Sequence, residues 1–508
     1  MLARARAGCV VGVEARAVDV EVHLANGLPG FEIVGLPETA VRESRVRVRA
    51  AILNSGFELP PQRAVLNLAP ADLKKRGASL DLAIAVALLG ACGRCAPNRL
   101  EETLLFGELS LTGEVRPARG LIPQLRSARQ RGLRTAIVPR VQLEEAGLVD
   151  GIDARGASDL AGAIAHLSGE LELPSAAGGG PEIEPRPSAD LADVQGQETA
   201  KRALEIAAAG GHHLLMVGPP GAGKTMLARR LPGILPRPSR EEALSLVTIA
   251  SAAGLGVGRV VRRPFRAPHH TASAAALVGG GDPIRPGEVT LAHGGVLFLD
   301  ELPEFARPAI ESFRTIMERG EVVVSRAKGR ASMPAGALVI AAMNPCPCGW
   351  DEDPTRICRC TPARIERYRA RVSGPILDRF DLHVSLPKVA LRELHRESRG
   401  EPSAVVRARV ERAREQLESL GERDASVATL LDALPLDARE LMVDASEALG
   451  LSMRGVARAT RVSRTIAALE ASERVRPDHV AEALSYRIFD RGEPGRSPTR
   501  RASIDKER

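Results

Sequence analysis

One glycine-rich octapeptide has the residue types that bind phosphate groups. It consists of Gly218, Pro219, Pro220, Gly221, Ala222, Gly223, Lys224 and Thr225. Glycines let consecutive backbone N–H groups face phosphate oxygens, and the N-terminus of a following helix adds a positive dipole. In such a loop Lys224 would reach the β- and γ-phosphates, and Thr225 would be a ligand of Mg²⁺. The pattern predicts a nucleotide site of the P-loop type.

The segments around the loop are expected to place it at the edge of a sheet. Residues 214–217 predict a short buried strand, and residues 226–231 predict the start of a helix. Residues 296–299 predict a second strand, which ends in Asp300 and Glu301. Because α/β sheets bind ligands at the carboxyl ends of their strands, Asp300 would hold Mg²⁺ through water and Glu301 would polarise the attacking water. A core strand ending in solvated acids is the weaker alternative beside a complete P-loop.

Three further polar residues have contexts that suit a nucleotide site. The apolar segment 338–343 ends in Asn344, which could orient the attacking water or simply form an Asn-Pro turn. Arg379 lies within Leu-Asp-Arg-Phe-Asp, and Arg454 begins a basic helical stretch. Taken alone, each arginine is better explained as a solvated surface side chain or a member of a structural ion pair, whereas the P-loop in the same chain favours a functional role.

Composition narrows the class of protein. The chain has 508 residues, 44% of them hydrophobic, which allows two to four domains of about 100–200 residues each. A net charge of +7 permits a polyanionic partner without requiring one. Aromatic residues make up only 2%, so phosphate contacts rather than base stacking would carry any nucleic-acid binding. No apolar run predicts a membrane helix or a signal peptide, so we expect a cytoplasmic protein without a membrane partner.

The chain is expected to have five parts. Residues 1–168 form a mixed α/β block, residues 169–189 a linker rich in Pro, Gly and acid, and residues 190–390 the nucleotide-binding block. Residues 391–490 predict a charged helical block, and residues 491–508 a disordered basic tail.

Local patterns in the first block predict both strands and helices. Residues 17–24 alternate between apolar and polar and end at Asn26-Gly27, which predicts a strand entering a hairpin. Further strands are expected at residues 64–68 and 135–138, and helices at residues 39–54 and 79–89.

Cysteines form one unusual cluster. Of the seven, four lie within fifteen residues as two close pairs, Cys346 with Cys348 and Cys358 with Cys360. Four thiols from two pairs could close a tetrahedral zinc site, although the spacing is not the usual C-x₂-C. Zinc binding and simple reduced cysteines both fit this pattern, whereas a disulfide does not suit the expected compartment. For the second pair, Cys92 and Cys95, we expect a structural role.

Four longer phrases resemble one family of proteins. They are Gly211-His-His-Leu-Leu-Met-Val-Gly-Pro-Pro-Gly, Arg263-Pro-Phe-Arg-Ala-Pro-His-His-Thr271, Leu291-Ala-His-Gly-Gly-Val-Leu-Phe-Leu-Asp-Glu-Leu-Pro-Glu-Phe305 and Asn344-Pro-Cys-Pro-Cys-Gly349. They are similar to AAA+ ATPases of the magnesium-chelatase and MCM-helicase clade, and within it to the ComM/YifB family. The resemblance covers nearly the whole chain except the linker and the tail. It implies ATP and Mg²⁺ as cofactors, and an α/β fold with a P-loop AAA+ α/β/α core and a C-terminal helical lid.

The resemblance also implies roles for the polar residues. Asn344 would be the sensor-1 residue and Arg454 the sensor-2 arginine. Arg379 would be an arginine finger that reaches the ATP of a neighbouring subunit, a contact worth about 10³ to 10⁵ in rate. Such a head-to-tail interface must close into a ring, and the resemblance implies a homo-oligomer of six.

A basic hairpin is expected just before the Asn344 strand. Residues 320–335 predict two strands around a turn, and the segment resembles the pre-sensor hairpin of MCM-type helicases. By that resemblance Arg326, Lys328 and Arg330 would face DNA in the pore, through contacts that ignore sequence and weaken with salt. An exposed hairpin kept soluble by its charge is the alternative.

The first block resembles the proteolytic domain of Lon in two segments, residues 74–81 and 106–121. Lon-type peptidases use a serine nucleophile and a lysine base. Ser79 would take the place of the nucleophile, but Ile122 stands where the base would be and cannot accept a proton. We therefore expect a non-proteolytic domain, in which Ser79 is a helix N-cap rather than a catalyst.

Three functions follow from these resemblances. The first is a ring-forming, ATP-driven DNA motor that migrates branches or unwinds DNA during homologous recombination in natural transformation. The second is a protein-remodelling motor like the magnesium-chelatase subunit, although chelatase motor subunits begin at the ATPase. The third, an ATP-dependent protease, is disfavoured by Ile122.

Overall fold

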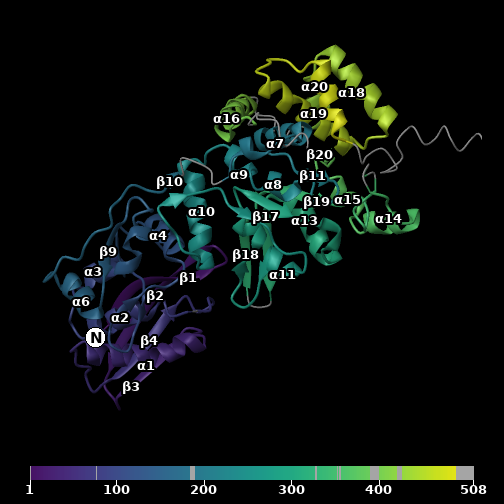
Figure 1. Ribbon diagram of the computed structural model, residues 1–508. Coiled ribbons are helices and arrows are strands. Elements are labelled where there is room, and N and C mark those ends of the chain that lie inside the picture. Colours follow the sequence, from purple (N-terminus) through teal and green to yellow (C-terminus); the bar gives the residue numbers. More distant parts are fainter. Residues whose placement is uncertain are drawn as a thin grey trace, which may run out of the picture.

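The computed structural model describes residues 2–75, 77–183, 189–326, 329–351, 353, 356–388, 400–419 and 426–487. Within them three regions follow one another along an elongated molecule (Figure 1). A mixed sheet with its helices lies at one end, a parallel sheet lies in the middle, and a group of helices lies at the other end. The expected basic tail, residues 491–508, falls outside the described residues.

The first region is a seven-stranded mixed sheet in the order β3-β4-β2-β1-β5-β8-β9. Its strands are β1 (Leu2–Val11), β2 (Glu14–Ala25), β3 (Gly30–Val34), β4 (Arg63–Ala69), β5 (Thr103–Leu105), β8 (Thr135–Pro139) and β9 (Asp153–Ala157). Its helices are α1 (Thr39–Asn54), α2 (Asp81–Ala91), α3 (Pro97–Glu102), α4 (Leu121–Gln130), η1 (Arg140–Gln142), α5 (Leu143–Ala146) and α6 (Leu160–Ser168), beside the short pair β6 (Glu108–Leu109) and β7 (Val115–Arg116). Helices α1 and α2 share one apolar core with β1, β2 and β4, whereas α4 contributes to a second core.

Most of the expected elements of this block are confirmed, and one connection is wrong. The strands at 64–68 and 135–138 and the helix at 39–54 are present. The strand at 17–24 is part of β2, but β2 pairs with β1 and β4, so no hairpin turns at Asn26-Gly27. The hairpin lies before this strand, with Val11 of β1 opposite Glu14 of β2. The partner strand was not predicted because its Ala-Arg alternation lacks the large side chains typical of strands.

The second region is a parallel sheet in the order β13-β16-β19-β11-β20. Its strands are β13 (Phe265–Arg266), β16 (Val296–Leu299), β19 (Leu338–Met343), β11 (Leu214–Val217) and β20 (Leu382–Ser385). Alternate residues of β16, β19 and β11 enter two cores, one on each face, which explains why all three strands are apolar runs. We call the ends of these strands the carboxyl edge and their beginnings the amino edge.

The helices around this sheet are α7 (Glu198–Gly210), α8 (Lys224–Ala228), α9 (Leu231–Ile234), α10 (Arg240–Ala253), α11 (Ala274–Val278), α12 (Glu288–Leu291), α13 (Arg307–Arg319), α14 (Pro362–Arg369) and α15 (Gly374–Leu377), with η2 (Leu191–Asp193) and η3 (Leu302–Glu304). Small strand pairs are β17 (Glu321–Arg326) with β18 (Gly329–Pro334), β14 (Gly279–Gly280) with β15 (Arg285–Pro286), and β10 (Glu182–Ile183) with β12 (Val260–Val261). The last pair places part of the expected linker 169–189 in a strand.

The third region is helical, with α16 (Ser403–Ser419), α17 (Val427–Asp432), α18 (Leu436–Leu449), α19 (Met453–Leu469) and α20 (Pro477–Ser485). Helix α19 lies between α20 and α7, so it connects this region to the parallel sheet. Among the described residues, every helix falls short of the length and hydrophobicity that a bilayer-spanning segment needs.

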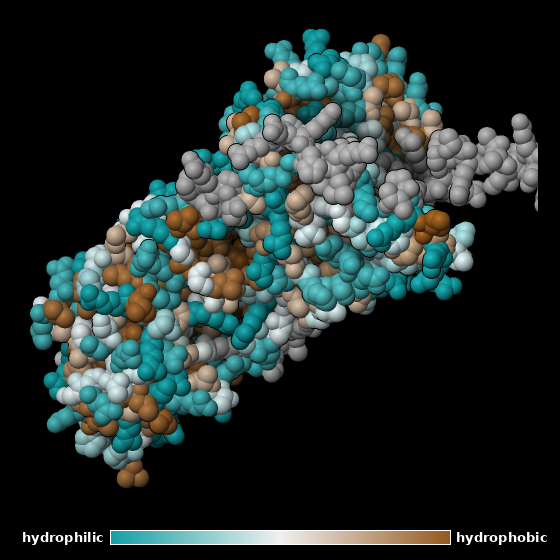
Figure 2. Space-filling view, in the orientation of Figure 1, coloured by the Kyte–Doolittle hydropathy of each residue, from teal (hydrophilic) through white to brown (hydrophobic). Residues whose placement is uncertain are grey.

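The first two regions share an apolar contact around α10. Leu121 and Ile122 of α4 belong to one core with Ala243 and Val247 of α10. The face shown in Figure 2 is mostly hydrophilic, with hydrophobic residues gathered near α10 where the two sheets approach each other. The first region is therefore packed against the parallel sheet region rather than tethered to it.

Candidate nucleotide-binding site

The glycine-rich loop joins β11 to α8 at the carboxyl edge of the parallel sheet. A Cβ atom on Gly218 would lie 2.5 Å from the carbonyl oxygen of Leu386, so only glycine fits there. Gly223 has φ of 92° and begins α8 from the left-handed region, which glycine adopts at little cost. Since the first N–H groups of a helix lack intrahelical acceptors, this turn leaves donors for phosphate oxygens.

The ammonium of Lys224 lies inside the loop, with the residue only 9% exposed. It donates to three oxygens: Gly218 O at 2.6 Å, Pro219 O at 3.0 Å and Asn344 Oδ1 at 3.1 Å. Burial lowers the pKa of this ammonium, and the negative charges of Asp300 and Glu301 oppose that shift. A buried cation held only by neutral oxygens is well placed to exchange some of them for phosphate oxygens.

Thr225 and Asp300, the two residues expected to hold Mg²⁺, lie together. The Thr225 hydroxyl donates to Asp300 Oδ2 over 2.9 Å, and Asp300 Oδ1 accepts from the Glu301 N–H over 3.0 Å. They meet because β11 and β16 both neighbour β19 in the parallel sheet, which brings their carboxyl ends close. A hydroxyl and a carboxylate are hard oxygen ligands of the kind Mg²⁺ prefers, so the donor set fits this ion.

Glu301 faces outward from the same edge, with its side chain 51% exposed. Its backbone is left-handed, with φ of 54°, which is uncommon outside glycine and marks functional turns. Glu301 Oε2 lies 3.4 Å from Nδ1 of His270, a residue that sequence reasoning did not assign to the site. The two residues meet because His270 closely follows β13, and β13 neighbours β16 in the sheet, a strand order that the sequence does not display.

Asn344 directly follows β19, the strand between β11 and β16. Its Oδ1 accepts from Lys224, as given above, and its backbone hydrogen-bonds the hydroxyl of Tyr368. The expected cysteine cluster begins two residues later. Lys224, Thr225, Asp300, Glu301 and Asn344 therefore converge on one edge of one sheet, where they can bind a nucleotide and orient water.

Arg379 lies on the other side of the sheet. It precedes β20, which runs parallel to β11, so it lies at the amino edge while the P-loop lies at the carboxyl edge. Within the chain it is 3% exposed, is paired with Glu318, and donates from Nε to Arg314 O over 2.9 Å. A four-residue strand separates the two edges by about 13 Å. The structure therefore does not bring Arg379 to the P-loop of its own chain.

Arg454 lies on the same side as Arg379. It is exposed at the start of α19. One turn later Arg458 hydrogen-bonds Asp378 O, and further along Thr465 Oγ1 lies 2.8 Å from His212 Nε2. Asp378 and His212 both precede strands of the parallel sheet, so α19 crosses the amino edge and its first turn lies beyond that edge. The structure thus places Arg379, and the helix that begins with Arg454, at the edge opposite the P-loop.

The hairpin expected before Asn344 is present as β17 and β18. Arg326 is the last residue of β17, and Arg330 is exposed on β18 opposite Ser325. Lys328 lies outside the described residues. The turn of the β1–β2 hairpin touches this element, since a Cβ on Gly12 would lie 3.1 Å from that of Ala331.

The Lon-like features of the first region have different uses in the structure. Ile122 is fully buried, and its N–H donates to Ser251 Oγ of α10 over 3.2 Å. Ile122, at the position of the expected base, therefore contributes to the contact with the parallel sheet region. The expected N-cap role of Ser79 is wrong, because α2 begins at Asp81 after Leu80 and has no side-chain cap.

Family models match three segments of the chain. They are described as magnesium chelatase, subunit ChlI, over residues 190–394; subunit ChlI of Mg-chelatase, over residues 20–142; and magnesium chelatase, subunit ChlI C-terminal, over residues 400–487.

Individual relatives match over nearly their whole length. The chain is 45% identical over 492 residues to the uncharacterized protein YifB of Salmonella typhimurium, covering 95% of this chain and 96% of that one. It is 43% identical over 493 residues to the competence protein ComM of Haemophilus influenzae, again covering 95% and 96%. A shorter match, 28% over 217 residues, links 40% of the chain to 21% of the DNA replication licensing factor Mcm2 of Drosophila melanogaster.

Proposed function

The chain belongs to the ComM/YifB family of magnesium-chelatase-like AAA+ proteins, and we propose that it is a ring-forming ATPase that moves along DNA. The observation that carries the proposal is the division of the expected catalytic residues between two edges of one sheet. A nucleotide site at one edge and two arginines at the other suit a motor whose active sites lie between subunits.

The carboxyl edge would bind and cleave ATP. The loop from Gly218 to Gly223 and Lys224 would hold the β- and γ-phosphates, while Thr225 and Asp300 would hold Mg²⁺, which neutralises charge on the phosphates. Glu301 would polarise the attacking water, and Asn344 would orient it against the γ-phosphate. Asn344 already contacts Lys224, so the two groups would act on the same phosphate.

The amino edge would complete the site of the next subunit. Since Arg379 cannot reach the P-loop of its own chain, a role as an arginine finger requires a neighbour. Arg454, at the start of the helix that crosses the same edge, would give a second positive charge to the same phosphates. Subunits that pair head to tail in this way close into a ring, and six is the number we propose.

DNA is the proposed substrate of the motor. Arg330 is exposed on β18 and Arg326 ends β17, and the next strand, β19, is directly followed by Asn344. These two arginines, with Lys328, which lies outside the described residues, are the proposed DNA contacts. A movement of Asn344 during ATP hydrolysis would thus be transmitted to the hairpin through β19 and the short segment between β18 and β19. The names of two relatives, a competence protein and a replication licensing factor, also support DNA as the partner. Branch migration or unwinding in recombination of incoming DNA would be the cellular task.

A protein-remodelling motor is the second candidate, because all three matching family models are named for a magnesium-chelatase subunit. In that case the hairpin would grip a protein partner. The N-terminal domain, packed on α10 through Ile122, would serve ring assembly or substrate binding in either case, without peptidase activity.

Strand displacement on a forked or four-way DNA junction separates the two candidates. The DNA motor should displace a strand with ATP, and Lys224→Ala should not. Arg330→Ala should weaken DNA binding on any sequence and reduce the slope of log affinity against log salt by about 0.7 to 0.9. Intact ATPase activity without displacement, and without DNA binding, would favour protein remodelling.

A further inference from the structure

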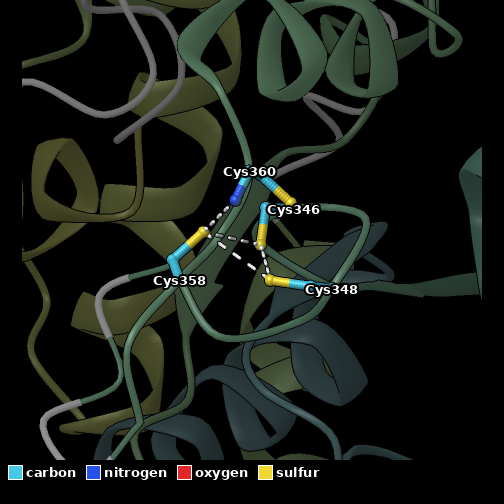
Figure 3. A group of neighbouring side chains, drawn as sticks. All are labelled: Cys346, Cys348, Cys358 and Cys360. Atoms are coloured by element: carbon cyan, nitrogen blue, oxygen red, sulfur yellow. Dashed lines mark hydrogen bonds between the residues drawn. The ribbon is translucent and has the colours of Figure 1, made fainter.

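The four clustered cysteines converge on one point beside the nucleotide site. Cys346 and Cys348 follow β19, and Cys358 and Cys360 precede α14, yet the four side chains lie together, with the sulfurs of Cys346, Cys348 and Cys358 facing one another (Figure 3). The four sulfurs lie within 4.8 Å of one another. This is the only cysteine-only group of metal-binding geometry in the described part of the chain.

The sulfur distances match those of a tetrahedral metal site. The pairs 346–348, 348–358 and 346–358 are separated by 3.4, 3.6 and 3.7 Å. Four thiolates at about 2.3 Å from zinc lie about 3.8 Å from each other at the corners of a tetrahedron. These three sulfurs thus need to move only a few tenths of an ångström to hold an ion, and the sulfur of Cys360 lies within 4.8 Å of them.

The surroundings of the sulfurs suit thiolates. The Cys360 N–H donates to Cys358 Sγ over 3.4 Å, and the backbone N–H of Trp350 hydrogen-bonds the Cys348 sulfur. Such N–H donors orient metal-bound thiolates and offset their charge. Arg356 stacks on the Trp350 ring at 4.2 Å and adds a positive charge to the same loop.

A second group of potential metal ligands in the described residues is less suited to a metal ion than the four cysteines. Glu470, Asp478 and His479 also lie close together. Arg476 already bonds both carboxylates, at 2.8 Å from Glu470 and 3.1 Å from Asp478. Their charge is neutralised by the chain itself, so this group needs no cation.

The turn that contains Cys346 and Cys348 packs against the nucleotide site. The turn from Cys346 to Gly349 is closed by the Gly349 N–H donating to Cys346 O over 3.0 Å. A Cβ on Gly349 would lie 2.6 Å from Cδ of Pro220, so the turn packs directly on the P-loop. Asn344, the Lys224 acceptor, is two residues before Cys346.

Helix α14 holds the same segment from the other side. It begins just after Cys360, and its last residue, Arg369, donates from Nε to Pro345 O over 3.0 Å. The preceding residue, Tyr368, hydrogen-bonds the backbone of Asn344. A metal that joins Cys346 to Cys360 would therefore close a loop of contacts around Asn344.

We propose that Cys346, Cys348, Cys358 and Cys360 bind one Zn²⁺, and that this closed structural site positions Asn344 against Lys224. The ion has no open coordination position and takes no part in the chemistry. The metal site stands on the cysteines alone, and only its link to turnover rests on the proposed ATPase function.

Metal content of the purified full-length chain tests the site directly. Elemental analysis should find about one zinc per chain, and Cys348→Ser and Cys358→Ser should lose it, whereas the matched Cys92→Ser and Cys95→Ser variants should keep it. Because a cysteine variant could fail to fold, Co²⁺ in place of zinc gives a second reading in the wild type. Absorption bands of tetrahedral thiolate coordination would support the site. Zinc-free protein whose four thiols react freely and give no such bands would overturn it.

A matched pair of variants tests the link to Asn344. Cys360→Ser should lose zinc and lower kcat by about 10- to 100-fold, as loss of supporting contacts around a functional site does. ADP binding, which depends on the P-loop, should change by less than about threefold. Cys360→His should retain zinc and most of the rate, because histidine also ligates zinc. Full turnover by zinc-free Cys360→Ser would refute the positioning role while leaving the metal content and the ATPase proposal standing.

Discussion

The two edges of the parallel sheet differ in how their functional residues are held. At the carboxyl edge Lys224 contacts Asn344 and Thr225 contacts Asp300 within one chain, and these residues already have the arrangement of a phosphate and Mg²⁺ site. At the amino edge Arg379 is buried against Glu318, and Arg454 is exposed. One edge is assembled, and the other has charged groups without a substrate within reach.

The difference between the two edges predicts which step each edge controls, nucleotide binding or hydrolysis. A preassembled carboxyl edge should bind nucleotide in a single chain, because binding needs no neighbour. Hydrolysis should need the ring, since the arginine finger must leave Glu318 or move with it to reach the adjacent site. Nucleotide binding and turnover should therefore respond differently to changes at the two edges.

The largest effects are expected from two changes at the carboxyl edge. Lys224→Ala removes the cation that holds the β- and γ-phosphates and should abolish both nucleotide binding and ATPase activity.

Glu301→Gln keeps the shape of its side chain and should bind ATP while losing at least about 100-fold in kcat. Fluorescent-nucleotide binding and phosphate release measure the two steps. Normal turnover by Glu301→Gln would refute the role of that carboxylate.

A change at the amino edge should spare binding and stop turnover. Arg379→Ala should lower kcat by about 10³-fold because it removes the finger, while ATP affinity at the chain's own P-loop stays within a fewfold of wild type. Arg439→Ala, which removes an exposed arginine paired with Asp432, is the matched control and should have little effect. Loss of ATP affinity in Arg379→Ala would mean that the two edges are not separate.

The carboxylate of Asp381 anchors the amino edge, and it should make the stability of the protein depend on pH. Burial alone would raise the pKa of Asp381, but the contact with His212 and the positive charge of Arg458 outweigh it and hold the pKa well below its usual range. Since the folded pKa lies below the unfolded value, the contribution is complete above about pH 4 and is lost as the pH falls further.

Asp381→Asn should therefore lower the free energy of unfolding by about 2 kcal/mol at pH 7, with a smaller difference below about pH 4. Denaturant unfolding at several pH values measures this. A difference between wild type and Asp381→Asn that stays constant down to pH 3 would exclude the ionised carboxylate as the anchor.

The smallest effects are expected in the first region, which contributes to neither edge. Ser79→Ala should leave ATPase activity within about twofold and should not change casein digestion, which we expect to be absent, because Ile122 cannot act as a base. Casein cleavage that needs ATP and is lost in Ser79→Ala would restore a peptidase function to this domain.

The carboxyl edge could be predicted from the sequence because its signals are local. A glycine-rich loop after one apolar run, and acids or an amide after two others, define strand ends wherever the strands lie, and the sheet brings them together. His270 was missed because its nearness to Glu301 depends on strand order, which the sequence does not display.

The amino edge and the first region depended on information that is not local. Whether Arg379 and Arg454 face the same side follows from the path of α19 across the sheet, fixed by Arg458 and Thr465. Ser79 was assigned as an N-cap from its residue type, yet the helix begins two residues later because the preceding turn continues to Leu80. Ile122 alone indicated a missing base, but only the packing shows its use in the contact with α10.

Mixing two inactive variants tests the divided site most directly. Lys224→Ala lacks a working carboxyl edge and Arg379→Ala lacks a working amino edge, so each alone should be inactive. In mixed rings an Arg379→Ala subunit keeps its P-loop and receives the finger of a Lys224→Ala neighbour, and ATPase activity should return. Mixed rings that form and remain as inactive as either variant would contradict an active site shared between subunits.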